Sequence, residues 1–162
     1  MATIYIPLTP EAAAPDGTAA PEFIMPQGTN FPVSALAYDA ATVEGAFWRF
    51  RASSYGTGNL TLDIEWYADT ASSGVVDWEA AISVITPNTD TQDVETDALA
   101  TVQAVDDTHL ATTGQRLHRA TITISNLDSL AADDIVTLGI ERDADDAGDT
   151  MAGDAHLVLA TL

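Results

Sequence analysis

The sequence predicts an all-β protein, an antiparallel two-sheet sandwich of about eight strands, and three observations support that fold class. Apolar and polar residues alternate with a period of two along several segments, as in strands that bury one face. Turn signals such as SSYGTGN at 53–59 and TPNTD at 86–90 separate those segments. No convincing long amphipathic helix interrupts them, so the strands are expected to pack sheet on sheet.

The first element is an extended N-terminal arm, residues 1–32, which holds six of the seven prolines. Proline lacks an N–H and pushes the preceding residue towards extended geometry. We therefore expect isolated short strands such as ATIYIP and EFIM in the arm, and no helix. The arm either wraps its own domain or reaches a neighbouring subunit, and composition favours neither alternative.

Residues 33–162 are expected to form the sandwich domain. The segment NLTLDIEWYAD places Leu62, Ile64 and Trp66 on one face, and its polar residues lie on the other. The alternation recurs in RATITIS, DIVTLGIER and DAHLVLATL, and VDWEAAISV is assigned as a strand rather than a helical turn. A jelly roll is favoured because it joins two four-stranded sheets and leaves few long edges. An immunoglobulin-like sandwich is the alternative.

Acidic residues dominate the charge of the chain. There are 25 of them against five arginines and no lysine, and the formal net charge is −20. Nucleic acids and anionic membranes attract clustered Lys and Arg, so we predict neither as a partner. An acidic shell in which Asp exceeds Glu, 18 to 7, is typical of hypersaline surroundings, where molar salt shortens the Debye length to about 3 Å. We predict a halophilic or marine source, with a merely acidic protein as the alternative.

The chain contains no cysteine, which excludes disulfides, thiolate zinc sites and a cysteine nucleophile. Its first residues, MATIYIPLTPEAAAP, lack the basic start and apolar core of a signal peptide. No apolar run approaches the roughly 18 residues of a membrane-spanning helix. We therefore expect a protein without an export signal.

Four motifs follow one another between about residues 44 and 157. They are WYADTASSGVVDWEAAI, TPNTDTQDVET, TTGQRLHRATITI and NLDSLAADDIVTLGIERDADDAGDTMAGDAHL. In this order they resemble virion structural proteins of tailed viruses of aquatic bacteria and haloarchaea. The resemblance implies a jelly-roll body, usually trimeric, on the capsid surface or attached to the tail, with no catalytic residues. Such proteins often have a glycine before the aspartate in the turn preceding IVTL. Here Asp133 and Asp134 occupy that turn, so its turn type is expected to differ from the one in those proteins.

The loop DADDAGDTMAGD, residues 143–154, is a candidate calcium site. It places Asp143, Asp145 and Asp154 at positions 1, 3 and 12 of a Ca²⁺-loop frame, with Gly148 at position 6. Position 5 is Ala147, which has no side-chain oxygen, and position 12 lacks the usual bidentate Glu. The favoured interpretation is a solvated hairpin loop without a cofactor, and Ca²⁺ binding is the alternative.

Other chemistry has less support. A pair of catalytic carboxylates cannot be singled out among 25 acids, and there is no G-x-S-x-G motif, so we predict no enzymatic activity. The histidines at 109, 118 and 156 show no metal-ligand spacing, and His118 is expected to be an edge or core residue. Arg49 and Arg51 lie on one face of a strand and are predicted either to hold a subunit interface or to pair within the monomer.

Jelly rolls also serve as carbohydrate-binding modules, in which exposed aromatic rings stack on sugars. Trp48 and Trp66 are expected in the core, and the position of Trp78 stays open. We predict a non-enzymatic component of a virus particle, an outer capsid or decoration protein located in the virion. Its expected partners are itself, as a homotrimer, and the major capsid or tail proteins. A carbohydrate-binding jelly-roll module, or a receptor-binding head attached to a tail or fibre, is the alternative.

Overall fold

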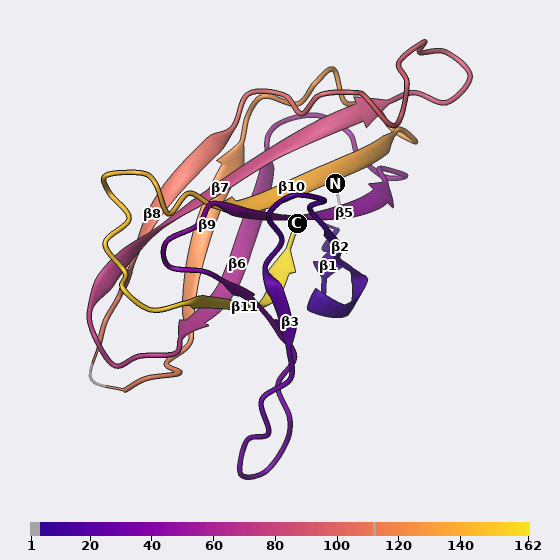
Figure 1. Cartoon of the computed structure of the whole chain (residues 1–162). Coiled ribbons are helices and arrows are strands. Elements are labelled where there is room, and N and C mark those ends of the chain that lie inside the picture. Colours follow the sequence, from indigo (N-terminus) through magenta and orange to yellow (C-terminus); the bar gives the residue numbers. More distant parts are fainter. Residues whose placement is uncertain (1–3, 112) are drawn as a thin grey trace.

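The protein folds into two antiparallel β-sheets packed face to face, in a computed structural model that describes residues 4–111 and 113–162 (Figure 1). The eight main strands are β4 (Ala35–Tyr38), β5 (Glu44–Arg51), β6 (Leu60–Ala68), β7 (Gly74–Ile85), β8 (Gln103–His109), β9 (His118–Ile124), β10 (Ile135–Arg142) and β11 (Ala155–Thr161). One sheet has the order β4-β11-β6-β9 and the other β5-β10-β7-β8. Among these eight strands, consecutive ones alternate between the two sheets, except that β7 and β8 are neighbours in one sheet. This is the connectivity of a jelly roll, and the predicted fold class is confirmed.

The N-terminal arm lies on its own domain. Its short strands β1 (Pro7–Leu8), β2 (Ala14–Pro15) and β3 (Glu22–Ile24) pair with β11, β5 and β4. The arm therefore extends both sheets, and of the two alternatives the structure shows the one within the chain. The expectation of no helix was wrong by one turn, because Pro10–Ala12 forms a 3₁₀-helix, η1. Proline is tolerated at a first helical position, where its missing N–H would have had no partner.

Three tryptophans fill the space between the sheets. Trp66 and Trp78 are fully buried and Trp48 is nearly so, which confirms two expectations and settles the position of Trp78. Trp78 packs edge-on against both Tyr38 and Trp66, with ring centroids 5.1 Å and 6.1 Å apart. The Nε1 of Trp48 donates to the carbonyl of Thr9 at 2.9 Å, which ties the arm to the core. None of these rings is available as a sugar-stacking platform.

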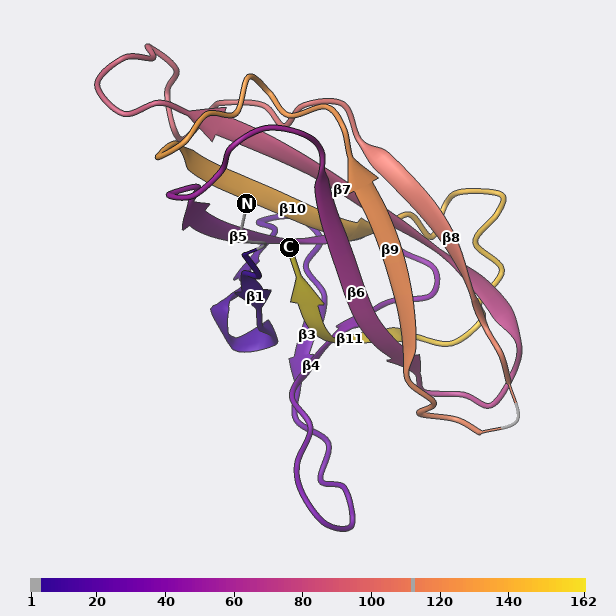
Figure 2. The ribbon, with the colours of Figure 1, turned by 180° about the vertical axis from the view of Figure 1, so that it is seen from behind.

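A narrow hairpin between β3 and β4 projects from the body (Figures 1 and 2). It is closed by a bridge between Gln27 and Pro32 and by backbone hydrogen bonds from Gly28 to Phe31 and from Val33 to Pro26. Phe31 is 68% exposed on it. Among residues 4–111 and 113–162, no helix has the length and apolarity needed to cross a bilayer.

Candidate functional site

The acidic loop between β10 and β11 is organised by an arginine. Arg142 ends β10 and is completely buried, and its five N–H groups all have acceptors. Two of them form a bidentate pair with Asp149, each at 2.8 Å, and the others donate to the carbonyls of Tyr38, Met151 and Gly153. A buried guanidinium therefore serves as the cation around which residues 149–153 fold.

Among the described residues, the three aspartates predicted to bind Ca²⁺ do not converge as one group of ligand atoms. Asp143 accepts a hydrogen bond from the backbone N–H of Asp145, a local turn on the surface. Asp154 lies at the far end of the loop, where its Oδ1 accepts from the backbone N–H of Ala40 at 3.2 Å. The ring of residues expected from spacing is therefore not observed, because Arg142 draws the middle of the loop inward.

Asp154 instead lies close to two other residues, Asp69 just after the end of β6 and His156 on β11. Among the described residues, ligand atoms of Asp69, Asp154 and His156 converge within 4.8 Å of one another. This group was not predicted from the sequence, because Asp69 lies 85 residues before Asp154 and becomes its neighbour only through the pairing of β6 with β11. The D-x-H spacing of Asp154 and His156, which places both on one face of a strand, was the available signal.

The other two histidines are core residues, as expected for His118. His118 and His109 are buried with ring centroids 4.7 Å apart, and both pack against Trp66. The Nε2 of His118 accepts from the backbone N–H of Leu110, so its Nδ1 carries the proton and donates to the carbonyl of Arg116. Burial lowers the pKa of His118 below its usual value, which keeps the ring neutral.

A second acidic group lies on the outer face of the sheet that contains β5, β10, β7 and β8. Asp77 on β7 is 8% exposed, and its Oδ1 has no hydrogen-bond partner among the described residues. Burial, and then the charges of Asp106 and Asp146, raise the pKa of Asp77 to about 6. The pKa of Glu79 rises to about 6 as well, through burial and the charge of Asp143. These carboxylates repel one another, which is the second cause of both shifts after burial.

The two arginines predicted for an interface make contacts within the chain. The guanidinium of Arg51 pairs with Asp133 at 3.1 Å, and the Nε of Arg49 donates to the hydroxyl of Thr137 at 3.1 Å. Both side chains are exposed on the outer face of β5. A role in a subunit interface stays a prediction.

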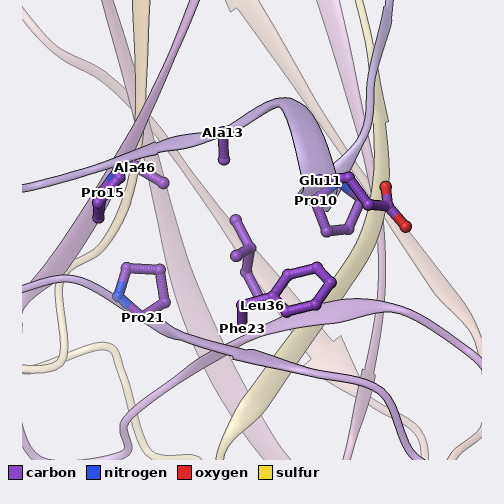
Figure 3. A pocket seen from close by; sticks show the side chains of 8 residues that line it. All are labelled: Pro10, Glu11, Ala13, Pro15, Pro21, Phe23, Leu36 and Ala46. Atoms are coloured by element: carbon purple, nitrogen blue, oxygen red, sulfur yellow. The ribbon is translucent and has the colours of Figure 1, made fainter.

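The surface has two larger grooves. One, of about 410 Å³, lies between the arm and β4 and is shown in Figure 3. Its lining is apolar apart from Glu11 and comprises Pro10, Ala13, Pro15, Pro21, Phe23, Leu36 and Ala46. Phe23 is the one aromatic ring in it and is about half exposed. This groove can hold an apolar group but offers few hydrogen-bonding side chains.

The other groove, of about 500 Å³, lies where the β5–β6 loop meets the chain ends. Its larger apolar lining residues are Ile4, Ile6, Phe50, Leu60, Leu130 and Leu162. Its rim carries the polar side chains of Arg51, Ser53, Ser54, Tyr55, Thr57 and Asn59. The loop is braced by Tyr55, whose hydroxyl donates to the carbonyl of Gly58 at 2.8 Å, and Gly58 has the positive φ (100°) that glycine tolerates.

Fold and surface together define a two-sheet jelly-roll protein with an aromatic and hydroxyl-rich groove at one edge. No family model matches the chain, and no curated protein does.

Among solved structures, the family 11 carbohydrate-binding module from Clostridium thermocellum, in complex with a β-1,3-1,4-mixed-linked tetrasaccharide, is similar at a TM-score of 0.49. The identity is 10%, over 98% of this chain and 87% of that one. CBM28, a module specific for non-crystalline cellulose, has the same TM-score and identity over 91% and 84%. TmCBM61 in complex with β-1,4-galactotriose reaches 0.41 with 9% identity over 93% and 86%. Likenesses this distant concern the β-sandwich architecture and leave the ligand of this chain open.

Proposed function

We propose that the chain is a non-catalytic carbohydrate-binding jelly-roll protein, and that the groove beside the β5–β6 loop holds the sugar. One observation supports this most: two aromatic rings, Phe50 and Tyr55, lie in the same groove as hydroxyl, amide and guanidinium side chains. Sugars present C–H faces that stack on aromatic rings and hydroxyls that need several donors and acceptors. The groove offers both kinds of contact side by side.

The size and rigidity of the groove suit such a ligand. A volume of about 500 Å³ lies within the range of about 300–1,000 Å³ that is usual for small-ligand sites. The loop is held at both ends, because Ala52 exchanges backbone hydrogen bonds with Asp133 and Asp134, and the Tyr55 hydroxyl bonds Gly58. A site formed in advance loses less conformational entropy on binding.

The negative charge of the chain indicates which class of sugar it could bind. The chain carries a net charge of −20, and the arginine in the groove, Arg51, is already paired with Asp133. Uronic acids and sulfated glycans would be repelled by this surface. The proposed ligands are therefore neutral polysaccharides or oligosaccharides.

Calorimetric titration with a panel of neutral polysaccharides, in molar NaCl, tests the proposal. We expect saturable binding of at least one member, with affinity reduced roughly fivefold in Tyr55→Ala, since a stacked ring contributes about 1 kcal/mol. The matched control is Phe23→Ala, which removes the exposed ring of the other groove and should leave binding unchanged. If binding is lost in Phe23→Ala and kept in Tyr55→Ala, the sugar binds in the groove that contains Phe23, and the proposed location is wrong. Absence of binding across the panel would refute the function.

An assembly role is the second candidate, and the projecting hairpin favours it. Met25 and Phe31 are exposed on a segment that extends beyond the body of the molecule (Figure 2). Exposed apolar side chains on a protruding element are typical of contact sites between proteins. The virion component and the homotrimer remain proposals on this basis.

Light scattering after gel filtration in molar NaCl tests that candidate. A trimer that becomes a monomer in Met25→Ser/Phe31→Ser supports assembly through the hairpin. A monomeric wild-type protein at high concentration argues against it.

A further inference from the structure

We propose that Asp69, Asp154 and His156 form a binding site for a divalent first-row transition metal ion. The site is distinct from the groove beside the β5–β6 loop. It lies at the opposite end of β6, next to the β6–β7 connection. It does not depend on the proposed function. Its ligand atoms already lie within 4.8 Å of one another.

Strand pairing places the three side chains together. Ala68 of β6 is paired with Ala155 of β11, so the residues just beyond, Asp69 and Asp154, are opposite each other. The backbone N–H of Asp69 donates to the carbonyl of Asp154 at 3.3 Å, which continues the ladder. His156 lies two residues along β11 and therefore on the same, outer face as Asp154.

His156 is the observation that distinguishes this group from an ordinary acidic cluster. The residue is only 9% exposed, and its Nδ1 is buried with no hydrogen-bond partner among the described residues. Tyr67, opposite it on β6, packs edge-on with ring centroids 4.8 Å apart and fixes the imidazole. A buried ring nitrogen without a hydrogen-bond partner is unfavourable, and a metal ion bound at Nδ1 would satisfy that atom.

The carboxylates are oriented by the chain around them. One oxygen of Asp154 accepts from the backbone N–H of Ala40 at 3.2 Å, which leaves its other oxygen available. Asp69 lies directly against Gly153, where any Cβ would collide with its carboxylate. Glycine at this position lets the Asp69 side chain approach Asp154.

The ligand set selects the kind of ion. One imidazole and two carboxylates suit Zn²⁺ and its first-row neighbours, whereas Ca²⁺ prefers six to eight oxygen ligands. Ligands at about 2.0–2.2 Å from a tetrahedral Zn²⁺ lie roughly 3.4 Å apart, so small rotations of Asp69 and Asp154 complete the geometry. Asp69 is exposed, which gives the ion access from solvent.

Equilibrium dialysis against ZnCl₂, in molar NaCl with excess Mg²⁺ to suppress non-specific association with the acidic surface, tests the site. We expect one tightly bound Zn²⁺ per chain and a higher melting temperature when it is bound. Asp69→Asn and His156→Gln should each weaken binding roughly tenfold or more. Asp145→Asn, a change in the same loop outside the ligand set, should leave it unaltered. With Co²⁺ as the probe, a d–d absorption band that is lost in His156→Gln would report imidazole ligation.

Three outcomes would overturn the inference. The first is absence of a saturable Zn²⁺ site, and the second is binding that persists in Asp69→Asn. The third is binding that depends on Asp145 and not on His156, which would return the site to the loop frame predicted from spacing. Because Asp69 is an exposed side chain, Asp69→Asn should fold even if His156→Gln does not.

Discussion

The two halves of the acidic loop deal with negative charge in different ways. At Asp149 the chain provides its own cation, because Arg142 is buried against it and all five N–H groups are used. Asp154 has no salt bridge to an arginine among the described residues, and its carboxylate lies near Asp69 and the imidazole of His156 instead. One half is therefore complete without any added ion, and the other is arranged so that an ion would complete it. Two aspartates of the same loop can thus differ in whether they need an added cation, depending on which side chains the fold places beside them.

The largest test of this contrast is removal of the internal cation. Arg142→Met should lower the free energy of unfolding by about 3–5 kcal/mol, because Asp149 would remain buried as an unpaired charge. The double variant Arg142→Met/Asp149→Asn should recover part of that loss, since it removes the uncompensated charge as well. Urea unfolding in molar NaCl measures both.

A matched surface pair provides the control for that experiment. Arg51 and Asp133 are 3.1 Å apart but each is about 60% exposed. Arg51→Met should therefore change the free energy of unfolding by no more than about 1 kcal/mol. An equal effect of Arg51→Met and Arg142→Met would show that burial does not distinguish the two ion pairs.

Salt dependence is the next test, because it separates paired from unpaired acids. The net charge of −20 should destabilise the fold in dilute buffer by roughly 2 kcal/mol, or about 4–8 °C in melting temperature. Most of the recovery should fall between about 0.1 M and 1 M NaCl, where the Debye length shortens from about 10 Å to about 3 Å. The buried Arg142–Asp149 pair is little affected by screening, so the dependence should arise at the surface.

Two variants locate the origin of that dependence. Asp106→Asn removes one charge from the group around Asp77 and should reduce the difference in melting temperature between low and high salt. Asp133→Asn removes a charge that is already compensated by Arg51 and should not reduce it. A wild-type melting temperature that does not change with salt would refute the halophilic prediction.

The sequence was sufficient for the architecture and insufficient for the sites, for identifiable reasons. Alternation at Leu62, Ile64 and Trp66 predicts a strand, because burial of one face is a local property with period two. The environment of Asp154 also depends on the register between strands that are far apart in the chain, and the local D-x-H spacing does not show that Asp69 lies beside it. The D-x-D spacing of the loop is equally compatible with a calcium site and with a turn closed by Arg142, and the burial of that arginine separates the two.

The smallest expected effect concerns Asp77, which has neither an internal cation nor an imidazole beside it. Its pKa in the folded state is raised from 3.8 to about 6, so the folded protein holds this proton more tightly than the unfolded chain. The stability that follows is fully present below about pH 3.8 and is lost as the pH rises through about 6. The amide of Asp77→Asn carries no charge at any of these pH values. The full rise in pKa, from 3.8 to about 6, corresponds to about 3 kcal/mol, and screening by solvent near the surface reduces the expected gain in stability at pH 7.5 to about 1 kcal/mol.

The pH dependence of that difference identifies its cause. The advantage of Asp77→Asn should shrink towards zero between about pH 6 and pH 4, as the wild-type carboxyl takes up its proton. His118 and His156 titrate in the opposite sense, because burial lowers their pKa and their contribution is lost as the pH falls below about 6.5. Both histidines are present in wild type and variant, so their effect cancels in the comparison. If the stability difference between Asp77→Asn and the wild type stayed constant across this range, packing of the amide would be its cause. The uncompensated charge of Asp77 would then not explain it.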